Sequence, residues 1–565
     1  MLFWVNALGL VMAFAQPQAD PRADPDVAYE GAFWEAQKYK LTERPDEAIA
    51  AFERCDALKP EGTLAKVELA KLYFEKGRND KALEYSSKAE ALPTIDAQEL
   101  EVLAEIHAQL GLTRSAAGLL ERASALRPDD LELMYALATV QIDASLNEAA
   151  LATIQRIEAK EGLTAQVGLE KKRLYLISGD VEAAAQALED LDEAFPQGRV
   201  YALERADLYA ANGQQSKAVK IWKGLLKEDS ANPHANLGMS AYYQQQGQYE
   251  ESYQSLKTAL QSPELDIDAK IAVLLGFYGA SEQSPALRAQ SYELLDIAEQ
   301  VHPNEAKVQA MKGDFLLRDN RKAEAQTAYR QAVSLPGGSL WPIWQQLLAI
   351  DLELQQWDRL YSDAEPAAQA HPNQPMVWLF LGYGAERTER TAEARKAFET
   401  GRDLAFGQSG LLAQFEASLG MVCDALKDVP ASDKHFARAL QLEPDNPLFL
   451  NNYAWVLAER SAKLNDALRY TQRSNQLDPN NPNSLDTYAW VLHKMGRNED
   501  ALVQIDKALV LASDPVYWEH KGLILEALER RSEALSSYQK ALELTLSRGQ
   551  EPTSVLRERL KALQP

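Results

Sequence analysis

Apolar residues recur along the chain at the three- and four-residue spacing of amphipathic helices. One stretch shows the pattern twice, with a break at Gly111 between the two apolar faces: Leu100, Leu103, Ala104 and His107, then Ala116, Leu119, Leu120 and Ala123. Pro60, Pro128 and Pro196 follow such second faces, where proline prevents a helix from continuing. Alternating runs of valine and isoleucine, which would indicate strands, are missing. The pattern predicts an all-α chain built from helix, turn, helix and linker.

This pattern returns every 34 residues over residues 29–266 without an insertion. Four columns share one register: Ala36, Ala70, Ala104, Ala138, Lys172, Ala206 and Ser240; Tyr39, Tyr73, His107, Gln141, Tyr175, Tyr209 and Tyr243; Gly77, Gly111, Ser145, Gly179, Gly213 and Gly247; Ala48, Ala82, Ala116, Ala150, Ala184, Ala218 and Ser252. Agreement of four columns indicates an internal repeat.

Each column has a physical role. Alanine is expected where two helices cross closely, because a larger side chain would push the backbones apart. Tyrosine is the large side chain that fills the space between one helix pair and the next. Glycine follows the first helix of each pair, where a residue with positive φ closes the turn. The columns therefore predict stacked helix pairs with one shared geometry.

Two later segments carry a known signature. Trp378, Leu381 and Gly382, followed by Ala394 and Phe398, resemble the tetratricopeptide repeat, which reads W-x2-L-G-x2-Y and then A, F, A and P. A second match consists of Trp518, Gly522, Ala534, Tyr538 and Ala541. The resemblance implies an α-solenoid (superhelix) of about 14–15 helix-turn-helix repeats over nearly the whole chain.

The register divides the chain. Seven regular units are expected over residues 29–266, a degenerate helical unit over 267–305, and seven more units over 306–548. The degenerate unit has an insertion near Ser281-Glu282-Gln283-Ser284-Pro285, and we interpret it as a joint between the two arrays. Residues 549–565 are expected to form a capping helix and tail, because a solenoid end needs a polar outer face.

The N-terminus resembles a targeting signal. Residues 2–15 form an apolar run too short to span a bilayer, and it ends in Ala13-Phe14-Ala15. This pattern predicts a signal peptide cleaved after Ala15, a disordered leader over residues 16–28, and a periplasmic or secreted protein. No lysine or arginine precedes the run, so an upstream start or an uncleaved apolar tail remains an alternative. No later stretch is apolar for long enough to predict a transmembrane segment.

The charge of the chain argues against two classes of partner. The formal net charge is −24, and a surface of that sign repels nucleic acid and anionic lipid. We therefore expect no nucleic-acid partner. Peripheral association with an envelope complex is compatible with this charge.

The histidines, cysteines and glycines of the sequence form no recognisable catalytic or metal-binding motif. The seven histidines lack metal-ligand spacing, and neither a phosphate-binding loop nor a nucleophile elbow occurs. His107 lies in the tyrosine column and is interpreted as a core residue, while Cys55 and Cys423 lie in core columns and are interpreted as small buried apolar residues. We predict no catalytic, cofactor-binding or metal site, and no enzyme activity.

A candidate binding surface comes from the resemblance. In this family the first helices of successive units line a concave groove, where repeat position nine contacts ligands; here that position reads Tyr383, Met421, Trp455 and Trp490. Indole rings supply apolar area and one hydrogen-bond donor each, which suits peptide capture. Asn451, Asn452, Asp486 and His493 lie nearby and could bond an extended backbone. The competing interpretation places both tryptophans in the core between units.

These observations favour a non-catalytic scaffold that binds partner proteins or peptides along its groove. The signal-like N-terminus suggests the bacterial cell envelope, with a role in secretion or envelope assembly. One alternative is a glycan-binding accessory protein for polysaccharide export that uses the aromatic groove. Another is a cytosolic repeat scaffold, which would be favoured if the N-terminus is not cleaved.

Overall fold

A computed structural model describes residues 25–282 and 284–563 of the chain. These residues form α-helices and one short 3-10 helix, η1 (Gln197–Arg199), and they contain no strand. The prediction of an all-α chain of helical repeats is confirmed. The chain divides into two compact units, Met1–Ser262 and Pro263–Pro565. The predicted signal peptide (1–15) and residues 16–24 of the leader lie outside the described residues.

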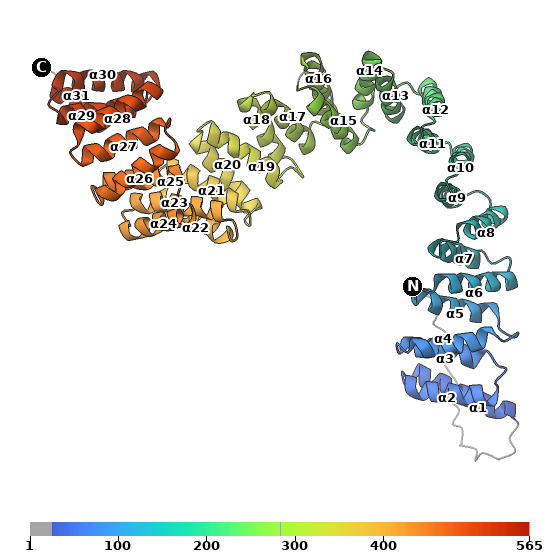
Figure 1. The fold of residues 1–565 in the computed structure, drawn as a ribbon. Coiled ribbons are helices and arrows are strands. Elements are labelled where there is room, and N and C mark those ends of the chain that lie inside the picture. Colours follow the sequence, from blue (N-terminus) through green and yellow to red (C-terminus); the bar gives the residue numbers. More distant parts are fainter. Residues whose placement is uncertain (1–24, 283, 564–565) are drawn as a thin grey trace, which may run out of the picture. The chain divides into compact units, whose positions relative to one another are not determined.

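Over residues 25–262, the first unit contains seven consecutive helix pairs, which follow one another in chain order (Figure 1). Its helices are α1 (Pro25–Leu41), α2 (Pro45–Leu58), α3 (Leu64–Glu75), α4 (Asn79–Glu90), α5 (Ala97–Gln109), α6 (Thr113–Leu126), α7 (Leu131–Asp143), α8 (Asn147–Glu161), α9 (Ala165–Ile177), α10 (Val181–Ala194), α11 (Val200–Ala211), α12 (Gln215–Glu228), α13 (Pro233–Gln245) and α14 (Tyr249–Gln261).

The second unit consists of eight helix pairs and a terminal helix. Its helices are α15 (Ile267–Ala280), α16 (Pro285–Val301), α17 (Ala306–Arg318), α18 (Lys322–Ser334), α19 (Trp341–Glu353), α20 (Trp357–Ala370), α21 (Pro375–Arg387), α22 (Thr391–Leu404), α23 (Ser409–Ala425), α24 (Val429–Leu442), α25 (Pro447–Glu459), α26 (Leu464–Leu477), α27 (Pro482–Lys494), α28 (Asn498–Leu511), α29 (Pro515–Ala527), α30 (Arg531–Ser547) and α31 (Ser554–Leu563).

The prediction of a disordered leader extending to residue 28 is wrong at its end, because α1 begins at Pro25. Proline fits the first turn of a helix, where its missing N–H would have no intrahelical partner. Asp26 in that first turn interacts favourably with the positive end of the helix dipole. Residues 25–28 therefore belong to the first helix pair.

The turn inside each pair has the geometry that the glycine column predicts. Gly77 has φ +71°, its N–H bonds to the carbonyl of Phe74, and the N–H of Arg78 bonds to the carbonyl of Tyr73. This Schellman arrangement satisfies carbonyls at the end of α3. The second unit keeps the same turn mostly without glycine: Glu389 has φ +63°, and the N–H of Arg390 bonds to the carbonyl of Ala385. The turn is thus retained even where the residue type no longer indicates it.

A close approach of glycine and an aromatic ring fixes the spacing within pairs of the second unit. A Cβ atom at Gly382 on α21 would lie 2.2 Å from the ring of Phe398 on α22. Three further pairs share the same sixteen-residue spacing and the same contact: Gly313 with Tyr329, Gly420 with Phe436, and Gly522 with Tyr538. The large ring therefore fills the space that the missing side chain leaves.

Three buried residues that are neither alanine nor tyrosine also pack as the repeat register predicts. His107 is buried and hydrogen-bonds Ser86 at 2.9 Å and Ser115 at 2.8 Å, and burial lowers its pKa. Cys55 and Cys423 are both free and buried, and burial raises the pKa of each thiol. A thiol with a raised pKa is a poor nucleophile at neutral pH, so both cysteines are core residues.

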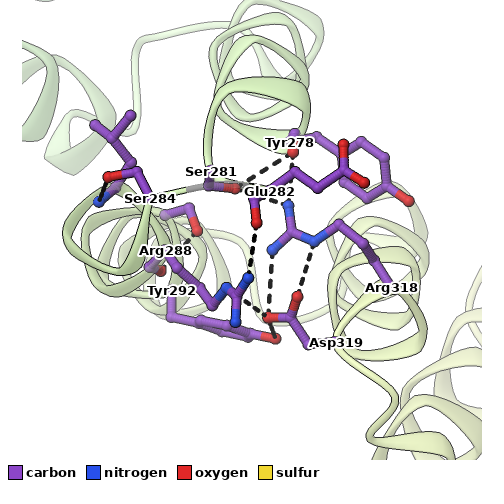
Figure 2. A network of polar contacts seen from close by, with 10 residues as sticks. Tyr278, Ser281, Glu282, Ser284, Arg288, Tyr292, Arg318 and Asp319 are labelled. Atoms are coloured by element: carbon purple, nitrogen blue, oxygen red, sulfur yellow. Dashed lines mark hydrogen bonds and ion pairs between the residues drawn. The ribbon is translucent and has the colours of Figure 1, made fainter.

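The pair α15–α16, which the sequence marks as degenerate, is held by a polar network (Figure 2). Arg318, at the end of α17, donates to the carbonyl of Tyr278 at 2.6 Å and to the hydroxyl of Ser281 at 2.7 Å. A guanidinium thus satisfies the C-terminus of α15. Burial acts to raise the pKa of Asp319, but hydrogen bonds from Arg318 and Tyr292 outweigh it and lower that pKa. The network ties the end of α15 to the end of α17.

The last helix packs on the last pair. Leu556 and Leu560 of α31 are buried in a cluster with Tyr538 and Ala541 of α30, while Arg557 of α31 is exposed. One face of α31 covers apolar surface and the other faces water, as a solenoid cap requires.

Candidate partner-binding site

The predicted site residues of the C-terminal repeats lie on first helices that begin in the same way. Asn446, Asn481 and Asp514 precede α25, α27 and α29, and the side chain of each accepts hydrogen bonds from backbone N–H groups of the first turn. A proline follows each of them at the first helical position. α25 contacts α27, and α27 contacts α29. Helices that start alike and pack side by side bring equivalent side chains together.

Four rings from these helices form a cluster that we call the aromatic ladder: Trp455, Trp490, His493 and His520. The rings of Trp490 and His520 stack with centroids 4.4 Å apart, and those of Trp455 and Trp490 lie 6.2 Å apart at an interplanar angle of 25°. His493 lies 5.1 Å from Trp490. The ammonium of Lys494 lies 4.7 Å from the centroid of the Trp490 ring, in cation–π distance.

The two tryptophans, which the sequence places alike, differ in exposure. Trp490 is 8% exposed, and its indole N–H donates to Glu459 at 2.6 Å. Trp455 remains partly exposed, and within the described part of the chain its indole N–H makes no hydrogen bond. Trp490 is therefore an internal member of the ladder, whereas Trp455 keeps a partly exposed surface and an indole N–H without a bond among the described residues.

Most polar residues of the predicted site already have partners. Asp486 is buried and hydrogen-bonds Nδ1 of His520 at 2.7 Å. Nδ1 of His493 lies 2.7 Å from the side-chain oxygen of Asn498, and burial lowers the pKa of His493. These contacts orient the rings, because a histidine with one bonded nitrogen has a fixed ring plane. Asp486 and His493 thus hold the ladder in place.

Asn451 and Asn452 differ from these residues. Asn451 is 9% exposed, and its Oδ1 atom has no hydrogen-bond partner among the described residues. It precedes Trp455 by four residues on α25 and therefore lies on the same helix face. Asn452 is partly exposed. A buried acceptor without a partner costs about 1–3 kcal/mol.

Tyr383 belongs to a different group of contacts. It lies on α21, its hydroxyl accepts a hydrogen bond from Gln414 at 2.9 Å, and its ring meets Phe398 edge-on at 5.5 Å. Burial raises the pKa of this hydroxyl. Tyr383 therefore packs between α21, α22 and α23, and the structure does not bring it into the ladder.

Comparison with known proteins identifies the repeat. The family model described as tetratricopeptide repeat matches residues 306–337 and 516–547, which cover the pairs α17–α18 and α29–α30. The chain is a tetratricopeptide-repeat protein. A second model, described as regulator of microtubule dynamics protein 1-3, matches residues 42–114. No curated protein matches the chain in sequence.

The chain also matches solved structures at low sequence identity. One is a tetratricopeptide repeat protein from Parabacteroides merdae, with 14% identity over 46% of this chain and 98% of that chain and a TM-score of 0.39. Another is yeast Tom70, with 14% identity over 89% of this chain and 95% of that chain and a TM-score of 0.33. A third is a thermophilic repeat protein of Thermus thermophilus, with 20% identity over 34% of this chain and 98% of that chain and a TM-score of 0.29.

Tetratricopeptide repeats build protein-interaction scaffolds, and the chain is a scaffold of this general kind. Within residues 25–282 and 284–563, no helix is long and apolar enough to cross a membrane.

Sequence reasoning missed two members of the site. His520 stacks on Trp490, and Glu459 accepts the indole N–H of Trp490. A signal for His520 was present, since it follows its partner Asp486 by 34 residues, which is one repeat.

Proposed function

We propose that this protein is a non-catalytic scaffold of the bacterial cell envelope that binds partner proteins or peptides at the surface formed by Trp455, Asn451 and Asn452. The observation that carries the proposal is the aromatic ladder, a set of rings from three successive first helices held by buried hydrogen bonds. Such rigid, preorganised aromatic surfaces are typical of interaction hot spots. Asn452, which is partly exposed beside Trp455, adds a polar side chain that could hydrogen-bond the backbone of the partner.

The envelope part of the proposal rests on residues 2–15, which have the length and the Ala13-Phe14-Ala15 ending of a cleaved signal. A role in secretion or envelope assembly is consistent with export of a scaffold that has no catalytic constellation in its sequence.

The geometry of the ladder favours proteins over glycans as partners. Sugar rings bind aromatic side chains through an open ring face. Trp490 already stacks on His520 and on Trp455, and of the two tryptophans Trp455 is the one that retains partly exposed surface. A single partly exposed indole beside the polar side chain of Asn452 suits an extended peptide better than a saccharide.

Affinity capture from envelope extract tests the proposal. The chain is used as bait beside Trp455→Ala, with Trp518→Ala as a matched control, because Trp518 is a partly exposed tryptophan of α29 outside the ladder. We expect the same envelope proteins with wild type and with the control, and a loss of about tenfold or more with Trp455→Ala. Trp490→Ala is unsuitable, because removal of a buried ring would cost roughly 3–5 kcal/mol of stability.

The mass of the mature bait protein, purified from its native source, is read in the same experiment. A mature chain that begins at Gln16 and is recovered with the envelope supports export. An intact N-terminus in the cytosolic fraction would instead favour the cytosolic scaffold. Equal capture by all three baits would contradict binding at the aromatic ladder. Competition by a polysaccharide extract would favour the glycan-binding alternative.

A further inference from the structure

The outward face of α1 carries an apolar strip. Val27, Trp34 and Leu41 are spaced seven residues apart, so they lie on one side of the helix, and they are 61%, 72% and 83% exposed. The opposite side of α1 packs inward, where Phe33 meets the ring of Phe52 on α2. No described element covers the strip. Three large apolar side chains in a row on a solvent-facing helix indicate an interaction surface.

Two charged residues beside the strip form no ion pair within the described part of the chain. Asp26, Glu35 and Lys40 of α1 pair with Lys59, Arg54 and Glu68 on neighbouring helices. By contrast, Glu30 and Lys38 lie exposed on the same side as the apolar strip, and among the described residues neither side chain forms an ion pair or a hydrogen bond. These unpaired charges of α1 thus lie on the face that carries the exposed apolar residues.

The strip is complementary to itself. Consider two antiparallel α1 helices related by a twofold axis at Trp34. A residue n positions before Trp34 in one copy then faces the residue n positions after Trp34 in the other copy. Val27 then faces Leu41, and Glu30 faces Lys38. Gly31 lies one turn before Trp34, and a Cβ atom built there would meet nothing within 4 Å. This open space leaves room for the second indole ring.

We propose that the strip binds a second copy of this chain through an antiparallel pair of α1 helices. The pair buries the two Trp34 rings at its centre and forms two Glu30–Lys38 ion pairs between the copies. This arrangement gives both Glu30 and Lys38 an ion-pair partner. A partner surface of one charge sign would pair with only one of the two residues. It lies in the first unit and is independent of the ladder on α25, α27 and α29.

The other end of the described chain supports this choice of surface. There α31 covers the last pair and turns charged residues outward, whereas α1 turns apolar residues outward. The strip is short, so the dimer is expected to be weak, with a dissociation constant on the order of 10–100 µM.

Sedimentation equilibrium of the full chain tests the proposal through charge reversal. Glu30→Lys and Lys38→Glu each place like charges opposite each other twice, and each is expected to weaken self-association roughly tenfold. The double variant restores opposite charges and should dimerise like wild type. An equimolar mixture of the two single variants should form a mixed dimer, because the lysine introduced in one chain then faces the glutamate introduced in the other. Lys71→Glu, at an exposed lysine of α3, is the matched control and should change nothing.

Recovery on mixing cannot come from a variant that fails to fold, so it separates lost contacts from lost structure. Cross-linking confirms the register: a Val27→Cys chain mixed with a Leu41→Cys chain should form an interchain disulfide, since both native cysteines are buried. A wild-type chain that stays monomeric up to roughly 500 µM would overturn the proposal. Failure of the mixed single variants to associate would overturn it as well.

Discussion

Replacing Gly382 with alanine is expected to lower the free energy of unfolding of the unit Pro263–Pro565 by about 3 kcal/mol. The added Cβ atom would lie 2.2 Å from the ring of Phe398, far inside van der Waals contact. The ring cannot move aside easily, because Phe398 is fully buried and meets the rings of Tyr383 and Phe415. Chemical denaturation monitored by circular dichroism measures the change.

Two companion variants show whether the cause is this contact. Gly276→Ala, on the exposed side of α15, adds the same methyl group where nothing lies within 4 Å, and it should stabilise the helix by about 0.5–1 kcal/mol. Phe398→Leu combined with Gly382→Ala should recover part of the loss, because the smaller side chain makes room for the methyl group. Gly382→Ala with the stability of wild type would mean that the spacing of α21 and α22 is not set by this pair.

Replacing Ala218 with glutamate is expected to destabilise the first unit by about 3 kcal/mol or more at neutral pH. Ala218 on α12 is fully buried among Ala202, Ala206 and Trp222, in the alanine column of the repeat. A carboxylate there would lose its hydration without gaining a partner. Because a solenoid unfolds in neighbouring groups of repeats, we expect a separate early transition in thermal unfolding.

The pH dependence of this variant has a definite sign. Burial disfavours the charged form, so the pKa of the new carboxyl would be raised in the folded state, which then binds more protons than the unfolded state. The loss of stability should therefore grow as pH rises from about 4 to 7. Ala218→Gln, of equal size without charge, should show no such dependence. Thermal unfolding of Ala218→Glu like that of wild type would contradict the register assigned to the repeat.

The fold could be predicted because each repeat must solve the same packing problem. Ala218 and Gly77 report on local requirements, a close helix crossing and a turn with positive φ, and these requirements restrict residue type wherever they occur. The start of α1 was missed because Pro25 and Asp26, read as leader residues, are equally suited to open a helix. The turn at Glu389 could not be read from residue type, because it keeps a positive φ without a glycine.

The site could be predicted only in part. The repeat register correctly placed Trp455, Trp490 and His493 on neighbouring helix faces, and the structure brings them together. The burial of Trp490 depends on how closely α29 packs on α27 and on the ring that His520 adds, which no pattern within one repeat encodes. Trp455 and Trp490 lie in near-identical segments but differ in burial, because the contacts that bury Trp490 come from the next repeat.

Site-specific photo-cross-linking shows whether a protein partner binds beside Trp455. A photoreactive residue is placed at Asn452, beside Trp455 on α25, or at Lys507, an exposed position of the second helix α28, and irradiated in intact cells. We expect a discrete protein partner to cross-link from position 452. The same cross-link should disappear when Trp455→Ala is added, and it should not form from position 507. Equal cross-linking from both positions, or cross-linking from 507 alone, would contradict binding at the aromatic ladder.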